Sequence, residues 1–192
     1  MIPRRTTHAP RSLGAGTGES LNEVPSIGME WPAFNERFAR FREAIQLMRQ
    51  LWTEDRVSFR GEFYRTENTT LYDRPVTPAS IFGAAAGAMV AKCAGRAGDG
   101  FICTAGKAES LYTETLLPNI AAGLEAAGKD GTGYERMIEM KASFDADAGR
   151  ALEDTRHWAA LALSQEEKLS VEDPLEMERL AASLPLERAA SC

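Results

Sequence analysis

Short apolar stretches alternate with longer helical patterns along the chain, and this alternation limits the possible folds more than any other feature. ASIFGAA (79–85) precedes a helical pattern over residues 87–98, and FICT (101–104) precedes another over 107–128. Short apolar runs next to turn residues indicate buried strands, whereas longer periodic runs indicate helices. Repeated strand–helix units form parallel sheets. The sequence therefore predicts an α/β fold with a parallel sheet.

Three further patterns predict local structure. Large apolar side chains recur in steps of three and four residues and predict one amphipathic helix with its aromatics in the core: Phe34, Phe38, Phe41, Ile45, Met48 and Trp52. Apolar and polar residues alternate from 135 to 145, which predicts a strand that buries Ile138, Met140, Ala142 and Phe144. Gly98, at the end of a helical pattern, is expected to be a left-handed C-cap.

Composition excludes some functions. The chain has 22 Lys and Arg against 28 Asp and Glu, a net charge of −6, which argues against a broad nucleic-acid surface but allows a small anionic ligand. Its three cysteines (Cys93, Cys103, Cys192) and two histidines (His8, His157) lack metal-site spacing. No metal, and a reducing cytoplasmic compartment, are the expectations.

The ends and the apolar content set the expected domain limits. The longest apolar stretch, 81–91, is shorter than the about 20 residues that span a bilayer, so no membrane span is expected. Residues 1–12 are basic but lack the apolar region of a secretory signal. We expect 1–12 to be a disordered leader and 13–192 to be one domain.

The first candidate site is GAGTGE, residues 14–19. It departs from the dinucleotide fingerprint G-x-G-x-x-G because Glu19 stands at the third glycine position. A plain glycine turn is one interpretation. The other is a turn that lets the backbone approach a flat cofactor, with Glu19 and Asn22 as polar groups at the end of a strand.

The second candidate is FGAAAGAM, residues 82–89, whose residues carry almost no polar side-chain chemistry. Small residues between a strand and a helix expose backbone N–H groups, which attract a phosphate or a carbonyl. Close packing of the helix on the strand explains the same residues equally well.

The third candidate is FICTAGK, where a buried strand runs into Thr104, a glycine turn and Lys107. A hydroxyl, free N–H groups and an ammonium suit a phosphate, and Lys107 is expected to open the next helix. The sequence is not a Walker loop. The alternative is an ordinary exposed lysine, and Lys168 taken alone would be a solvated charge.

Several stretches together resemble the coenzyme F420-dependent glucose-6-phosphate dehydrogenases of the luciferase-like superfamily: GTGESLNEVP, ERFARFREAIQLMRQLWTEDRVSFRGEFY, MVAKCAGRAGDGFICTAGK and LSQEEKLSVEDPLEMERLAASLPLE. The resemblance runs from about Leu13 to Ser191. It implies a (β/α)8 TIM barrel with its site at the C-terminal ends of the strands. It also implies hydride transfer from C1 of glucose 6-phosphate to the deazaflavin, giving the lactone, and a homodimer in the full-length family.

The resemblance assigns roles to residues. It implies that Glu19 is the carboxylate beside the sugar and that Asn22, Ala85, Ala86 and Gly87 contact the cofactor. It likewise implies sugar-phosphate ligands, which are Thr104, Lys107 and Lys168.

The departures from the family also matter. Family members exceed 300 residues, and their first third, with a histidine and a tryptophan at the reacting carbon, has no counterpart here. Cys192 stands where the family has a phosphate-binding arginine, Gly83 where a β-branched residue is usual, and Ala88 where proline is frequent. The expectation is a partial barrel without its N-terminal and C-terminal units. The alternatives are an FMN- or F420-dependent relative with another substrate, a monooxygenase among them, and an inactive fragment.

Overall fold

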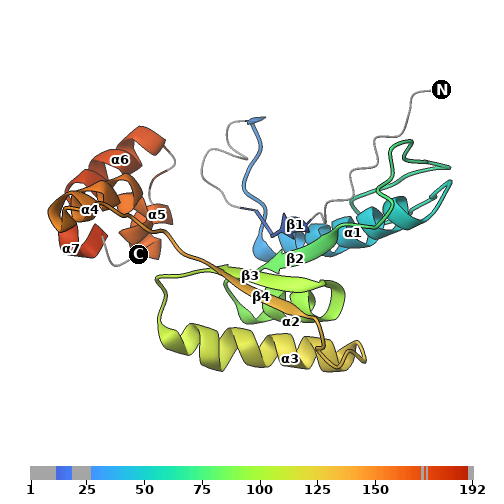
Figure 1. Ribbon diagram of the computed structural model, residues 1–192. Helices are drawn as coiled ribbons and strands as arrows, with labels where there is room; N and C mark the ends of the chain where they lie inside the picture. Colours follow the sequence, from blue (N-terminus) through green and yellow to red (C-terminus); the bar gives the residue numbers. More distant parts are fainter. Residues whose placement is uncertain (1–11, 19–26, 170, 172, 190–192) are drawn as a thin grey trace. The chain divides into compact units, whose positions relative to one another are not determined.

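The computed structural model describes residues 12–18, 27–169, 171 and 173–189 (Figure 1). The chain divides into two compact units. The first contains residues 1–17, 32–103 and 109–137, and the second contains 18–31, 104–108 and 138–192. Glu19 and Asn22 lie outside the described residues.

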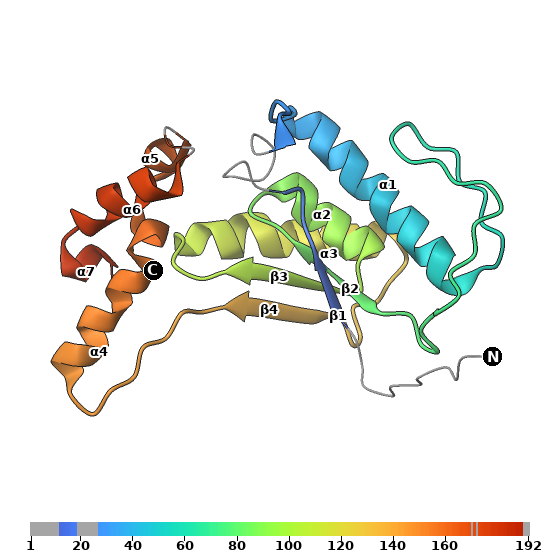
Figure 2. The same cartoon turned by 90° about the horizontal axis from the view of Figure 1, so that it is seen from above.

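Four strands form one sheet in chain order: β1 (Ser12–Ala15), β2 (Ser80–Ala84), β3 (Gly100–Thr104) and β4 (Glu135–Glu139). β1 and β3 both pair with β2 in parallel, with Leu13 opposite Ile81 and Phe82 opposite Gly100. The arrows of β3 and β4 point the same way in Figure 2. The parallel sheet predicted from the strand–helix alternation is confirmed.

Helices connect the strands of the first unit: α1 (Phe34–Thr53), α2 (Ala88–Ala97), the π-helical turn η2 (Leu111–Leu116) and α3 (Leu117–Ala126). Pro118 stands in the first turn of α3, directly after η2. Proline has no N–H for the ladder of a continuous helix, so a wider turn followed by a new helix start accommodates it.

The core of the first unit lies between these helices and the sheet. Phe41 and Ile45 of α1 are buried together with Ile81, Phe101 and residues of α2 and α3. The rest of the predicted stripe packs against this core, except Phe34, which stays partly exposed and stacks on Phe38 with ring centroids 5.8 Å apart. The prediction of a core role is confirmed for Phe38, Phe41 and Trp52 and is wrong for Phe34.

The second unit contains short helices: α4 (Ala148–Asp154), the 3-10 helix η3 (Thr155–Ala162), α5 (Gln165–Leu169), α6 (Pro174–Ala182) and α7 (Leu186–Ala189). Asp147 and Asp173 cap α4 and α6 by accepting hydrogen bonds from backbone N–H groups of the first turn. A separate apolar cluster around Ala159, Leu163 and Met177 holds this unit together. No helix of the described residues is long and apolar enough to cross a bilayer.

Two local predictions were wrong. The strand expected over 135–145 ends at Glu139, and Ile138, Met140 and Phe144 are exposed. Alternating apolar and polar residues do not by themselves bury one face of a strand, because another element must also cover that face. Gly98 has an extended conformation, φ −84° and ψ 169°. Glycine is needed at position 98 because a Cβ there would lie 2.6 Å from the Ala94 carbonyl oxygen.

Candidate functional site

The C-terminal end of β2 leads into the N-terminus of α2 through Ala85, Ala86 and Gly87. Ala85 is buried and its N–H donates to the Ile102 carbonyl oxygen at 3.2 Å, which fixes this turn against β3. Ala86 is exposed and Gly87 is half-buried. The turn is thus held by backbone bonds, while its outer side stays open.

Gly87 is the N-cap of α2, and no side chain caps this end. The first N–H groups of a helix have no partner within the helix, so they can bind an electronegative atom of a ligand. A Cβ added at Gly87 would meet no atom within 4 Å among the described residues. An open backbone turn at a helix N-terminus fits the edge of a flat cofactor, and Ala85, Ala86 and Gly87 are the residues that would hold it.

Close packing, the alternative explanation of this stretch, applies to Gly83 instead. A Cβ at Gly83 would lie 2.5 Å from the Ala94 Cβ of α2. The two explanations therefore divide the segment: Gly83 brings the helix close to the strand, and Ala86 and Gly87 leave space beside it.

The end of β3 carries the phosphate candidates. Thr104 is the last residue of β3 and is exposed, and Gly106 follows with φ +76°. Ala105 donates its N–H to the Glu139 carbonyl oxygen at 2.8 Å, so the turn is tied to the end of β4. Lys107 is exposed in the bend before the helix, which begins at Glu109 rather than at Lys107 as predicted.

Lys168 lies on α5, in the same compact unit as residues 104–108. Its Nζ donates to the Leu161 carbonyl oxygen at 2.8 Å. Nearby, the Ser164 N–H and the Arg188 guanidinium both donate to the Glu167 carboxylate. These groups lower the pKa of Glu167, with the Ser164 N–H as the main cause and burial as a smaller opposing effect. Lys168 is therefore an anchored side chain in an ordered turn.

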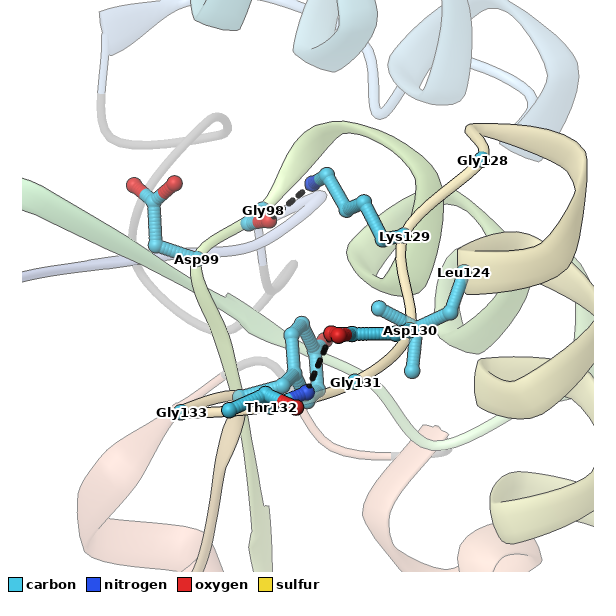
Figure 3. A pocket seen from close by; sticks show the side chains of 10 residues that line it. Gly98, Asp99, Leu124, Gly128, Lys129, Asp130, Gly131, Thr132 and Gly133 are labelled. Carbon is cyan, nitrogen blue, oxygen red and sulfur yellow. Dashed lines mark hydrogen bonds between the residues drawn. The ribbon is translucent and has the colours of Figure 1, made fainter.

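Sequence reasoning missed a polar pocket of about 490 Å³ at the other end of the sheet, beside the starts of β3 and β4 (Figure 3). Residues 128–134, GKDGTGY, form much of it. The Lys129 Nζ donates to the Gly98 carbonyl oxygen at 2.8 Å, and Asp130 accepts from the Thr132 N–H. Burial lowers the pKa of Lys129, against the opposing effect of Asp99, and raises the pKa of Tyr134 to about 12.

This pocket has a structural explanation. Lys129 binds carbonyl groups at the C-terminus of α2, where a cation is favourable. Asp99 accepts from Arg49 of α1 at 2.9 Å and from the Ile81 N–H at 2.8 Å. In βα barrels the N-terminal ends of the strands serve stability and the C-terminal ends serve function. The glycine-rich pattern of 128–133 was the signal for this loop.

The described residues contain no cluster of His, Cys, Asp and Glu that could hold a metal ion. Cys93 and Cys103 are free and half-buried, and burial raises the pKa of each thiol. Neither has the lowered pKa of a reactive cysteine.

Residues 12–190 match the family described as luciferase-like monooxygenase. The chain is 56% identical to the F420-dependent glucose-6-phosphate dehydrogenase of Nakamurella multipartita, over 93% of this chain and 52% of that protein. It is 54% identical to the protein of that name from Beutenbergia cavernae, over 100% of this chain and 55% of the relative. The chain thus spans about half the length of the curated relatives it matches.

The chain is also similar to a solved structure, of which it again covers about half. An F420-dependent secondary alcohol dehydrogenase, in complex with an F420-acetone adduct, superposes with a TM-score of 0.82 at 31% identity. The match covers 94% of this chain and 54% of that chain.

Proposed function

Because the chain belongs to the luciferase-like monooxygenase family, we propose that it is part of a dehydrogenase that oxidises glucose 6-phosphate, or a similar sugar phosphate, with coenzyme F420. The observation that carries the proposal is the turn after β3, with Thr104, Gly106 and Lys107, in a chain more than half identical to proteins of that name. A relative that acts on an unphosphorylated substrate has no evident use for this turn. The described backbone of β2, β3 and β4 belongs to a partial TIM barrel of this family.

In this proposal coenzyme F420, when bound, would supply the hydride acceptor for C1 of the sugar. Ala85, Ala86, Gly87 and Asn22 orient the ring system, with the backbone N–H groups at the start of α2 as donors. Glu19 receives the proton of the C1 hydroxyl, as a placed carboxylate can. Thr104, Lys107 and Lys168 bind the phosphate and thereby position C1.

The wider context is also part of the proposal. Residues 13–192 act as one functional domain after a leader of residues 1–12, and the full-length protein is a cytoplasmic homodimer of carbohydrate metabolism that binds no nucleic acid. The free thiols of Cys93 and Cys103 support a reducing compartment. The net charge of −6 supports the absence of a nucleic-acid partner.

The experiment is a chimaera in which residues 12–190 replace the matching segment of the Nakamurella multipartita relative. Lys107→Ala in this chimaera removes one cation from the phosphate site. Loss of a hydrogen bond to a charged group costs about 1.5–3 kcal/mol, so we expect KM for glucose 6-phosphate to rise about ten- to a hundred-fold. KM for coenzyme F420 should stay nearly constant.

Lys92→Ala is the matched control, because Lys92 is an exposed lysine in the middle of α2. Equal effects of Lys107→Ala on both KM values would reject the phosphate role. FMN in place of coenzyme F420 tests the alternative of an FMN-dependent enzyme. A chimaera that is active only with FMN would assign the protein to the flavin-dependent members of the family.

A further inference from the structure

Two cations from other elements of the first unit hold the C-terminal end of α2. The Arg49 Nη2 of α1 donates to the Ala97 carbonyl oxygen at 2.7 Å. The Lys129 Nζ, from the loop after α3, donates to the Gly98 carbonyl oxygen at 2.8 Å (Figure 3). The last carbonyl groups of a helix have no partner within it and form the negative end of its dipole, so cations bind them favourably.

Asp99 connects these contacts to the sheet. Its Oδ2 accepts from the Arg49 guanidinium at 2.9 Å and from the Ile81 N–H at 2.8 Å, and its own N–H donates to the Ile81 carbonyl oxygen at 2.8 Å. Ile81 is fully buried in β2. We call Arg49, Asp99 and Lys129 the clamp, because together they fasten the end of α2 to the core of the sheet.

Close backbone contacts fix α2 sideways. A Cβ at Gly83 of β2 would lie 2.5 Å from the Ala94 Cβ, and a Cβ at Gly123 of α3 would overlap the Lys92 carbonyl oxygen. α2 therefore packs directly on β2 and on α3, with no long side chain between them that could adjust. Because the helix is also continuous in its hydrogen bonds, a displacement of its C-terminal end shifts its N-terminal end as well.

The N-terminal end of α2 carries the backbone N–H groups that the proposed function assigns to the cofactor. Gly87 is the N-cap, and no side chain of the described residues caps this end. α2 has ten residues, which at the helical rise correspond to about 15 Å. The clamp and the turn at Ala85, Ala86 and Gly87 are therefore at opposite ends of one short helix.

We propose that Arg49 and Lys129 are positioning residues of the cofactor site, which hold the C-terminal end of α2 and thereby fix the N–H groups at its N-terminal end. The inference rests on the proposed function, which assigns Ala85, Ala86 and Gly87 to the cofactor. Both cations lie at the far end of the helix from these contacts, so they act through α2.

The first measurement is hydrogen exchange by NMR on the 192-residue chain, which needs no cofactor. The Ala85 and Ala91 amides report on the N-terminal end of α2, because they donate to the Ile102 and Gly87 carbonyl oxygens at 3.2 Å and 3.0 Å. Arg49→Met removes the cation and keeps most of the aliphatic chain. Substitutions in an element that couples two sites change the coupling by about two- to thirtyfold, so both amides should exchange faster by about that factor.

Arg40→Met is the matched control, because Arg40 lies on the same helix as Arg49 but its guanidinium pairs with Glu36. It should leave exchange at the N-terminal end of α2 unchanged. Faster exchange in Arg49→Met that is confined to the Gly98 amide would show a local effect and overturn the proposal. Equal acceleration of the Val57 and Thr69 amides, which pair with each other in a separate bridge, would show a general loss of stability and overturn it too.

The second measurement is the Kd of coenzyme F420 for the chimaera, by titration calorimetry without substrate. Arg49→Met and Lys129→Met should each raise this Kd about two- to thirtyfold. Lys129→Arg, which keeps the cation, and Arg40→Met should bind like the unsubstituted chimaera. A chimaera that binds the cofactor equally well with and without the two cations would overturn this inference alone. An unsubstituted chimaera that does not bind coenzyme F420 would reject the proposed function, and this inference with it.

Discussion

Gly83 sets how closely α2 lies on the sheet. Its missing side chain leaves room for Ala94, whose Cβ would be 2.5 Å from a Cβ at position 83. Overpacking of this kind costs about 1–3 kcal/mol. We expect Gly83→Val, which introduces the type of residue usual in the family, to lower the free energy of unfolding in urea by about that amount.

A double mutant isolates this contact. Ala94→Gly removes the opposing methyl group and costs about 1 kcal/mol of helix stability by itself. The loss in Gly83→Val with Ala94→Gly should be smaller than the sum of the two single losses. If the losses of the two single mutants simply add up in the double mutant, the contact with Ala94 is not the reason for glycine at position 83.

Some single residues could be predicted from the sequence and others could not. The turn at Gly106 was predictable, because a glycine between a strand and a polar segment favours a left-handed backbone. Gly98 and Gly83 were not, because their reason is the distance to another element. Lys168 is important only through the resemblance, since nothing in its local sequence distinguishes it. The placement of Glu19 and Asn22 stays a prediction.

At the scale of elements, Glu43 of α1 holds the segment that follows this helix. Its carboxylate accepts three backbone N–H groups, from Glu62 at 2.7 Å, Phe63 at 3.0 Å and Tyr64 at 3.2 Å. Burial raises the pKa of Glu43, but the three N–H donors together have a larger effect in the opposite direction. The pKa of Glu43 therefore lies below its usual value. Gly61 is glycine because a Cβ there would overlap this carboxylate.

This arrangement predicts a pH dependence. A carboxyl whose pKa is lower in the folded state stabilises the fold fully above its unfolded pKa of about 4.3, and the effect is lost as pH falls through the lower folded value. We expect the protection of amides 62–64 against hydrogen exchange to fall in that acidic range. Glu43→Gln should remove the pH dependence and lower protection at neutral pH.

Glu36→Gln is the control for this prediction, because Glu36 also lies on α1 but its carboxylate pairs with Arg40, four residues on, and its side chain is 42% exposed. It should leave amides 62–64 unchanged. The same pH dependence in Glu43→Gln and wild type would assign it to another group.

The periodic helix α1 and the short apolar strands β2 and β3 could be predicted, because their patterns reflect burial on one face or on both. In the segment that Glu43 holds, the antiparallel bridges Val57–Thr69 and Arg60–Arg65 form a hairpin. The helical pattern over 107–128 did not separate the π-helical turn η2 from α3, although Pro118 stands where α3 starts. The length of β4 could not either, since it depends on pairing with β3.

At the scale of the whole molecule, the alternation of strands and helices sufficed to predict a parallel sheet. The barrel to which this sheet belongs came from the resemblance, because four strands by themselves fit several α/β folds. The same comparison explains the expected limit of function. The resemblance implies that a histidine and a tryptophan at the reacting carbon come from a segment that has no counterpart in this sequence.

The most direct test of the account compares two proteins in one assay, the loss of visible absorbance of oxidised coenzyme F420 with glucose 6-phosphate. The account predicts no turnover above background for the 192-residue chain. It predicts turnover by the chimaera that joins residues 12–190 to the flanking segments of the Nakamurella multipartita relative, since positioning contributes about 7–11 kcal/mol and a placed base about 10²–10⁴-fold. Turnover by the chain alone at rates typical of enzymes, or a folded chimaera without activity, would contradict it.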